Sequence, residues 1–215
     1  MAIRGKLLCL LCILSMFSTA WAERSHNESA AIALQQRLSF IQSFRTQFEQ
    51  ITRTPEGTVV QSSSGDLWIG ADASFKIVTK VPYAQYLVSD GDDFWSYEPD
   101  LYQATVAKLV KDINKVPILL FGGKDLSLLD SYKISSVIQD ELSVFTLSPI
   151  EEDSLFLNIK LSFREMLPVS IIILDSLGQE TRLDFQNSSL NPIVKPSEFQ
   201  FTAPPGVDVI DERAL

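Results

Sequence analysis

The chain has 215 residues, of which 46% are hydrophobic and 21% charged, and its formal net charge is −9. This negative charge argues against nucleic acid and anionic lipid headgroups as partners, because both attract basic surfaces. The single histidine is His26, and both cysteines lie within the first 22 residues. Zinc sites and Cys–His catalysis therefore lack ligands and a nucleophile, so we expect no metal, no cofactor and no enzyme activity.

Residues 1–22 have the three parts of a secretory signal peptide. Arg4 and Lys6 form a basic start, residues 7–17 are almost entirely apolar, and residues 20–22 supply an A-x-A cleavage site. Cleavage would leave 16 basic and 27 acidic residues, a net charge of −11. We expect residues 23–215 to fold as one exported, soluble, monomeric domain without disulfides, held together by its core alone.

The first predicted element is an amphipathic helix over residues 29–50. Apolar side chains recur there at helical spacing, and the sequence Thr-Pro-Glu-Gly at 54–57 would end the helix. Phe40, Phe44 and Phe48 are expected to form its inner face.

Short segments with alternating polar and apolar residues follow, separated by turn residues. A hairpin is predicted over residues 86–97, because Ser-Asp-Gly-Asp at 89–92 is typical of a tight turn. The other predicted strands are 58–61, 65–69, 75–80, 102–106, 132–138, 142–148, 155–163, 169–174, 181–186 and 199–201.

The segment from 108 to 130 breaks this alternation. Pro117 could begin a short helix over residues 118–121, which Gly122 and Gly123 would end, and a second helical turn is expected at 126–129. Helical residues are too few to cover a flat sheet of ten or eleven strands. The predicted fold class is therefore α+β, mainly antiparallel β: an incomplete, half-open β-barrel with a long N-terminal helix and short lid helices over an apolar cavity.

Several motifs occur in an order that resembles the periplasmic outer-membrane lipoprotein carrier family (LolA-like). They are Gly-Asp-Leu-Trp at 65–68, Leu-Val-Ser-Asp-Gly at 87–91, Phe-Trp-x-Tyr at 94–97 and Phe-x-Phe-Thr-x-Pro-Pro-Gly-Val at 199–207. The resemblance spans about residues 30–213. It implies a non-enzymatic periplasmic carrier that accepts acylated lipoproteins from an inner-membrane ABC lipoprotein-releasing complex. The carrier would shield their acyl chains and deliver them to an outer-membrane lipoprotein receptor.

The resemblance also implies roles for individual residues. The family has a proline followed by an apolar helix in the middle of the chain, so Ile118, Leu119, Leu120 and Phe121 would form a lid. Strand alternation places further side chains toward the cavity, although ordinary core packing remains an equal alternative for each of them. With the three phenylalanines of the helix, the candidate cargo-binding residues are Phe75, Ile77, Leu87, Trp95, Leu155, Leu157, Ile159, Leu183 and Phe185.

One position departs from the family pattern. The family carries an arginine shortly after the Gly-Asp-Leu-Trp strand, and its side chain latches the lid. Here that position is Ala71, followed by Asp72 instead of a proline. How a lid would be latched is left open.

Three other functions are weighed against this one. The first is a related half-barrel that binds or senses free glycolipid or phospholipid. The second is a lipid hydrolase with a hydrophobic tunnel, for which the sequence offers no histidine base. The third is a purely structural β-protein, which would take up no apolar dye.

Overall fold

The protein is described by a computed structural model over residues 28–110, 117–122, 130–151 and 154–214, so the predicted signal peptide and the predicted turn at 126–129 lie outside the described residues. A helix over residues 28–40 precedes one sheet of twelve strands. None of the helices in the described ranges is long and apolar enough to cross a membrane. The strands are β1 (Phe44–Arg53), β2 (Val59–Ile69), β3 (Ser74–Val81), β4 (Gln85–Asp90), β5 (Asp93–Glu98), β6 (Gln103–Lys108), β7 (Tyr132–Gln139), β8 (Leu142–Pro149), β9 (Phe156–Arg164), β10 (Leu167–Asp175), β11 (Glu180–Leu190) and β12 (Asp208–Asp211), and the 3₁₀ helices include η1 (Pro99–Leu101), η2 (Pro117–Phe121) and η4 (Pro196–Phe199).

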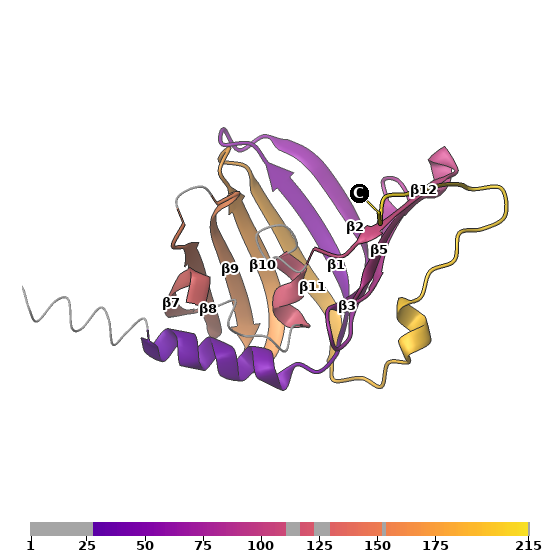
Figure 1. Ribbon diagram of the computed structural model, residues 1–215. Helices are drawn as coiled ribbons and strands as arrows, with labels where there is room; N and C mark the ends of the chain where they lie inside the picture. The colour runs from indigo at the N-terminus through magenta and orange to yellow at the C-terminus, as the bar shows by residue number, and fades with distance from the viewer. Residues whose placement is uncertain (1–27, 111–116, 123–129, 152–153, 215) are drawn as a thin grey trace, which may run out of the picture.

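The strand order is β12-β6-β5-β4-β3-β2-β1-β11-β10-β9-β8-β7. All pairings are antiparallel except the parallel pair of β12 with β6. Two runs of sequential strands, β2–β6 and β7–β11, are joined through β1, which pairs with β2 on one side and with β11 on the other. The sheet is open and strongly curled, and the N-terminal helix runs across the lower ends of its strands (Figure 1). The predicted mainly antiparallel, half-open sheet is thus confirmed.

The N-terminal helix is shorter than predicted. It ends at residue 40, and residues 44–53 form β1 instead of the last turns of a helix. Phe44 and Phe48 are buried while Arg45, Gln47 and Glu49 are exposed, which is the two-residue period of a strand. A spacing of four residues between phenylalanines fits a helix and a strand equally well, so the predicted extension of the helix to residue 50 was wrong.

A single asparagine fixes the point where the helix ends. The Oδ1 atom of Asn191 accepts hydrogen bonds from the backbone N–H groups of Gln42 and Ser43, at 2.7 and 3.2 Å. Its Nδ2 atom donates to the carbonyl oxygen of Phe40 at 3.0 Å. The bond to Phe40 satisfies one of the carbonyl groups that the end of a helix leaves without partners. The end of β11 therefore holds the chain where it turns from helix to strand.

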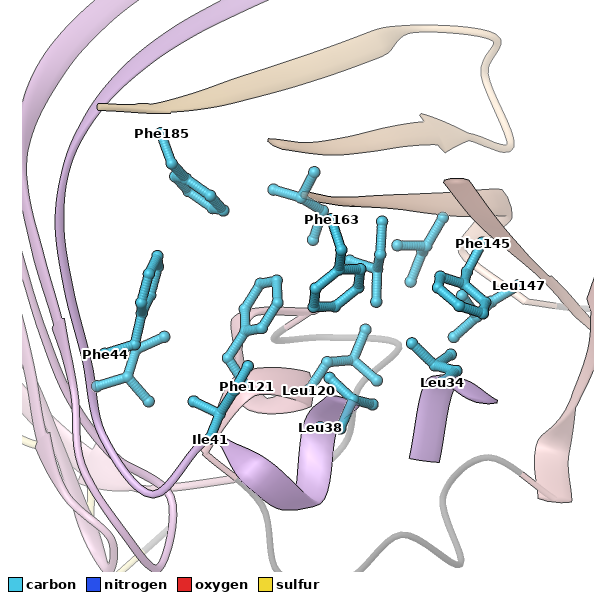
Figure 2. Close-up of a cluster of buried hydrophobic side chains, with 14 of the residues drawn as sticks. Leu34, Leu38, Ile41, Phe44, Leu120, Phe121, Phe145, Leu147, Phe163 and Phe185 are labelled. Carbon is cyan, nitrogen blue, oxygen red and sulfur yellow. The ribbon is translucent and has the colours of Figure 1, made fainter. Parts of the chain in front are cut away.

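The main core lies on the concave side of the sheet, between the helix and strands β1 and β7–β11. Leu34 and Leu38 of the helix, Phe121 of η2 and Phe163 of β9 are all at most 3% exposed. The ring of Phe121 lies 6.1 Å from that of Phe44, 6.4 Å from that of Phe163 and 6.0 Å from that of Phe185 (Figure 2). η2 therefore fills the middle of the curled sheet with apolar side chains.

The C-terminal segment covers the opposite, convex face of β3–β6 (Figure 1). The ring of Phe201 packs 5.3 Å from Trp95 and 5.4 Å from Tyr97. Residues 199–201, predicted as a strand, end η4 and continue as irregular chain. β12, which was not predicted, then pairs with the edge strand β6.

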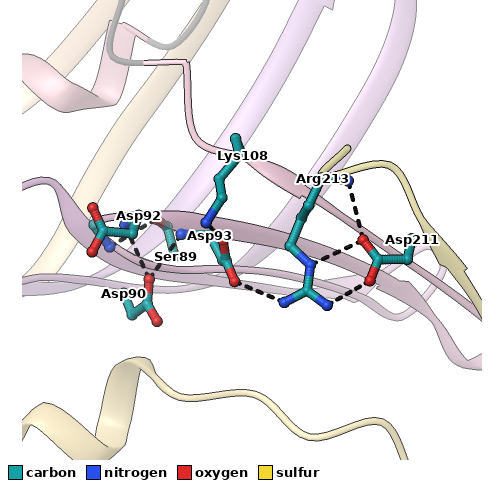
Figure 3. A network of polar contacts seen from close by, with 8 residues as sticks. Ser89, Asp90, Asp92, Asp93, Lys108, Asp211 and Arg213 are labelled. Carbon is teal, nitrogen blue, oxygen red and sulfur yellow. Dashed lines mark hydrogen bonds and ion pairs between the residues drawn. The ribbon is translucent and has the colours of Figure 1, made fainter. Parts of the chain in front are cut away.

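An ionic network holds β12 in place (Figure 3). Arg213 donates to Asp93 at 3.1 Å and to both carboxylate oxygens of Asp211, and Lys108 donates to Asp93 at 2.6 Å. The Arg213 guanidinium lowers the pKa of Asp211 to about 2 through hydrogen bonds to its carboxylate. Hydrogen bonds from Lys108 and Arg213 likewise lower the pKa of Asp93. The end of the chain is thus tied to β5 and β6.

Candidate functional site

A groove of about 570 Å³ opens on the concave face at the end of the sheet farthest from the helix. This volume lies within the ~300–1,000 Å³ typical of ligand sites. The rim around the groove is formed by the first part of β2, the β3–β4 turn and the last residue of β5. Its lining residues are Phe48, Gln50, Val60, Gln61, Ser62, Ser63, Ile77, Thr79, Pro82, Tyr83, Ala84, Gln85, Leu87, Glu98 and Leu183.

The floor of the groove is apolar. Ile77 of β3 pairs with Leu87 of β4. Leu183 of β11 pairs with β1 two residues beyond Phe48, on the side toward the rim. Ile77 and Leu183 also pack against the main core, so the groove is continuous with it. Gly65 leaves room for the Phe48 ring, since an added Cβ would lie only 3.0 Å from Cε1 of that ring. The floor thus offers apolar contacts on several strands.

Toward the rim, the same inward positions carry polar side chains. Along β1, the buried Phe44 and Phe48 come first, and Gln50 lies two residues after Phe48. Along β3, Thr79 likewise follows Phe75 and Ile77. Strand register places further polar side chains on this face, because Gln50 pairs with Ser63 and Thr79 pairs with Gln85. The concave face is therefore graded from apolar near the helix to polar at the mouth.

Some of the predicted cargo-binding residues lie in this groove and others lie in the core. Phe48, Ile77, Leu87 and Leu183 line the groove. Phe44, Phe75, Ile159 and Phe185 lie in the packed interior at 9% exposure or less, and Phe48 is itself only 3% exposed although it borders the groove.

The predicted lid residues form η2, as the proline-initiated pattern predicts. Leu119, Leu120 and Phe121 are buried, and Ile118 packs partly buried between the main core and a smaller cluster around Phe75. Phe75 in turn lies 6.1 Å from the ring of Phe94. η2 thus contacts both the main core and the smaller cluster around Phe75.

The predicted inward orientation of Trp95 was wrong. Strand register places Leu87 opposite Ser96 and places Trp95 opposite Val88, so Trp95 is on the convex face. There it packs against Phe201 of the C-terminal segment. Because neighbouring residues of a strand face opposite sides, a one-residue error in register reverses the assignment.

Three other predicted inward residues lie outside the packed interior. Leu155 is 56% exposed, Leu157 is 53% exposed, and Phe40, at the end of the helix, is 49% exposed. On β9 the cause is a bulge: Asn158 pairs with Leu174, but Asp175 pairs with Phe156, so one residue is skipped. The bulge reverses the alternation, and Phe156 takes the inward place expected of its neighbour.

Ala71, at the position of the expected arginine latch, lies in the β2–β3 turn. Its carbonyl oxygen accepts hydrogen bonds from Ser74, at 2.7 Å from Oγ and 3.1 Å from the backbone nitrogen. The turn reaches η2 through the backbone instead, since the Ala73 N–H donates to the Gly122 carbonyl at 3.5 Å. Gly123, which was expected to end the short helix together with Gly122, lies outside the described residues.

Sequence reasoning missed the polar side chains that line the groove. Simple alternation predicts that the polar residues of a strand face solvent, and the helical pattern of residues 29–50 places Gln50 at the end of a helix. The signal that could have found them is a strand whose inward positions change from apolar to polar along its length. The missed residues are Gln50, Gln61, Ser63, Thr79, Gln85 and Glu98.

Comparison with known proteins gives a consistent family. The family described as "Outer membrane lipoprotein carrier protein LolA" matches residues 39–202. A protein named outer-membrane lipoprotein carrier protein from Pseudomonas putida KT2440 is 37% identical over 83% of this chain and 86% of its own length. One with the same name from Alcanivorax borkumensis SK2 is 34% identical over 91% of each chain.

A solved structure shares the fold at low identity. The crystal structure of an uncharacterized conserved protein from Thermus thermophilus superposes with a TM-score of 0.53 and 12% identity, covering 83% of this chain and 97% of that one. The family match over most of the chain and the carrier proteins above 30% identity agree. This chain therefore belongs to the outer-membrane lipoprotein carrier (LolA) family.

Proposed function

We propose that this chain carries lipoproteins through the periplasm, holding their acyl chains on the concave face of its sheet while they are in water. The observation that supports this most directly is the groove of about 570 Å³, whose floor of Phe48, Ile77, Leu87 and Leu183 continues into the core. Membership of a family whose relatives are named lipoprotein carriers agrees with it.

The energetics explain why such a protein is needed. A 16-carbon acyl chain exposes about 15 methylenes, so its transfer from a membrane to water costs on the order of 12 kcal/mol. This cost is comparable to the whole stability of a domain, ~5–15 kcal/mol. A groove with an apolar floor lowers the cost and lets the acyl chains leave one membrane for another.

Loading would require η2 to move. The groove gives access only to the part of the concave face near the rim. Deeper in, Phe121 fills the space between Phe44, Phe163 and Phe185. In this proposal η2 is the lid, and acyl chains replace its side chains in contact with the core. Exchanging one set of apolar contacts for another keeps net affinity moderate, so the cargo can be released.

The carrier would exchange cargo with two membrane partners. An ABC lipoprotein-releasing complex in the inner membrane would load it, and a receptor at the outer membrane would unload it. The part of the β2–β3 turn that meets η2 has no arginine, so the closed lid would be held by apolar packing and by the Ala73–Gly122 backbone contact.

The test combines identification of the cargo with a charge placed in the groove. Protein purified from periplasm should yield acylated proteins by mass spectrometry. Leu183→Glu should lower the uptake of a fluorescent acylated peptide at least tenfold, because an unpaired charge in an apolar site costs several kcal/mol.

Gln186→Glu is the matched control, since it adds the same charge to the same strand at an exposed position. It should take up the acylated peptide as the unsubstituted protein does, and both variants should keep their far-UV circular dichroism. Equal uptake by folded Leu183→Glu and by the control would refute the groove as the acyl site.

A further inference from the structure

The polar side chains at the mouth of the groove stand out because, among the described residues, they take no part in the polar contacts of the fold. Gln50, Gln61, Ser63, Thr79 and Gln85 line the groove, yet none of their side chains makes a hydrogen bond or ion pair within the part of the chain that the structure describes.

Their arrangement follows from strand register and is not a scatter of surface residues. Gln50 of β1 lies opposite Ser63 of β2, one pair closer to the rim than Phe48 and Gly65. Thr79 of β3 lies opposite Gln85 of β4, one inward pair beyond Ile77 and Leu87. A band of amide and hydroxyl groups therefore crosses four neighbouring strands directly above the apolar floor.

One further lining residue, outside this polar band, is charged. Glu98 is the only Asp, Glu, Lys, Arg or His among the lining residues of the groove, and its carboxylate has no partner within the described ranges. The nearby Lys80 of β3 is paired with Asp66. Lys80 directly follows Thr79 and Asp66 directly follows Gly65, so this ion pair lies on the other face of the sheet. The mouth thus presents neutral hydrogen-bonding groups together with a negative charge.

We infer that this polar band binds the uncharged ester and amide groups that link acyl chains to the rest of the cargo molecule. We also infer that Glu98 disfavours lipids with a phosphate at that position. This inference rests on the proposed carrier function and adds the chemical class that the groove prefers: acylated peptide over anionic phospholipid. Amide N–H and hydroxyl groups donate to ester and amide carbonyls. A carboxylate a few ångströms from a phosphate repels it in a partly enclosed site.

The experiment measures a ratio of two affinities. An apolar fluorescent dye bound to the full mature protein is displaced either by a triacylated lipopeptide with an uncharged peptide or by phosphatidylglycerol with the same acyl chains. The unsubstituted protein should prefer the lipopeptide. Glu98→Gln removes the charge but keeps a polar side chain, and should reduce this preference by roughly threefold to tenfold.

Asp100→Asn is the matched control. It removes the same charge two residues away, at an exposed position outside the groove lining, and should leave the ratio as it is in the unsubstituted protein. Gln50→Leu tests the neutral part of the band. It should lower lipopeptide affinity relative to dye affinity by roughly twofold to tenfold, the worth of one neutral hydrogen bond.

The possible outcomes distinguish a failure of this inference from a failure of the proposed carrier function. If both lipids displace the dye but Glu98→Gln leaves the ratio unchanged, or Asp100→Asn lowers it equally, the inference is wrong and the carrier function stands. If the lipopeptide does not displace the dye from the unsubstituted protein at all, the carrier function falls, and the inference falls with it.

Discussion

The two ends of the concave face share strands β1, β2 and β11 but differ in packing and polarity. Near the helix, Phe44, Phe163 and Phe121 are packed ring against ring and are at most 1% exposed. At the rim, inward positions such as Gln50 and Gln85 are partly exposed and lack partners among the described residues. Close packing is thus concentrated at one end, and the other end presents partly exposed side chains. Substitutions at the two ends should therefore differ in kind as well as in size.

The largest expected effect is at the filled end. Phe163→Ala should lower the free energy of unfolding by about 3–5 kcal/mol, because it leaves a cavity among closely packed rings. Leu183→Ala, on the partly exposed groove floor, should cost about 1–2 kcal/mol. Urea denaturation followed by circular dichroism gives both values. Equal losses at the two positions would contradict the division of the concave face.

A smaller effect is expected at the end of η2, where Gly122 lies against the last residue of β2. A Cβ atom added at Gly122 would lie 2.7 Å from Cγ2 of Ile69 and 2.9 Å from the Gly70 carbonyl oxygen. Gly122→Ala should therefore push η2 out of place and cost about 1–3 kcal/mol, as overpacking does.

The same displacement should open the interior, so Gly122→Ala should bind more apolar dye per molecule than the unsubstituted protein. Gly57→Ala is a useful contrast, since nothing lies within 4 Å of an added Cβ there, although its positive φ adds some backbone strain. If dye uptake rises as much in Gly57→Ala, the gain reflects general loosening and not movement of η2.

The smallest expected effect is on the convex side, at β12. The depressed pKa of Asp211, about 2, means that its contribution to holding β12 is complete above its ordinary pKa of 3.8 and is lost as the pH falls toward 2. The protection of the 208–211 amides, taken as the ratio of the intrinsic to the observed exchange rate, should therefore fall across this range before the main core unfolds.

Arg213→Ala should produce the same loss of protection at residues 208–211 already at neutral pH, because it removes the donor to both Asp211 and Asp93. Global unfolding should hardly change, since these side chains are exposed and solvent screens their interaction. Exchange at 208–211 that stays slow in Arg213→Ala would mean that backbone pairing with β6 suffices to hold the strand.

Much of the fold could be predicted from local pattern. The 86–97 hairpin forms as β4 and β5, with Oδ1 of Asp90 accepting from the backbone N–H groups of Asp92 and Asp93. Pro117 begins a short 3₁₀ helix and Gly122 follows its end. These features depend on a few neighbouring residues, whose turn chemistry is sufficient to specify them.

The errors occur where distant contacts decide the structure. Phenylalanines at every fourth residue predict a helix over β1, and only pairing with β2 and β11 settles the matter. Alternation alone puts Trp95 and Leu157 on the wrong side, because register and a bulge are set by partner strands. The polar band of the groove could not be predicted for a related reason, since its residues come together only when four strands are aligned.

The position of β1 between β2 and β11 also bears on how quickly the protein folds. Strands β2–β6 and β7–β11 each pair with a neighbour in sequence, so each run can form from short hairpins. Pairing Phe44 with Leu190 instead closes a loop of well over a hundred residues, whose entropy cost must be met before the contact forms. Proteins dominated by such distant pairings fold slowly, in milliseconds to seconds. We therefore expect the β1–β11 seam to form late, so that an incomplete chain exposes the edge of β1 that pairs with β11 until residues 180–190 have been added.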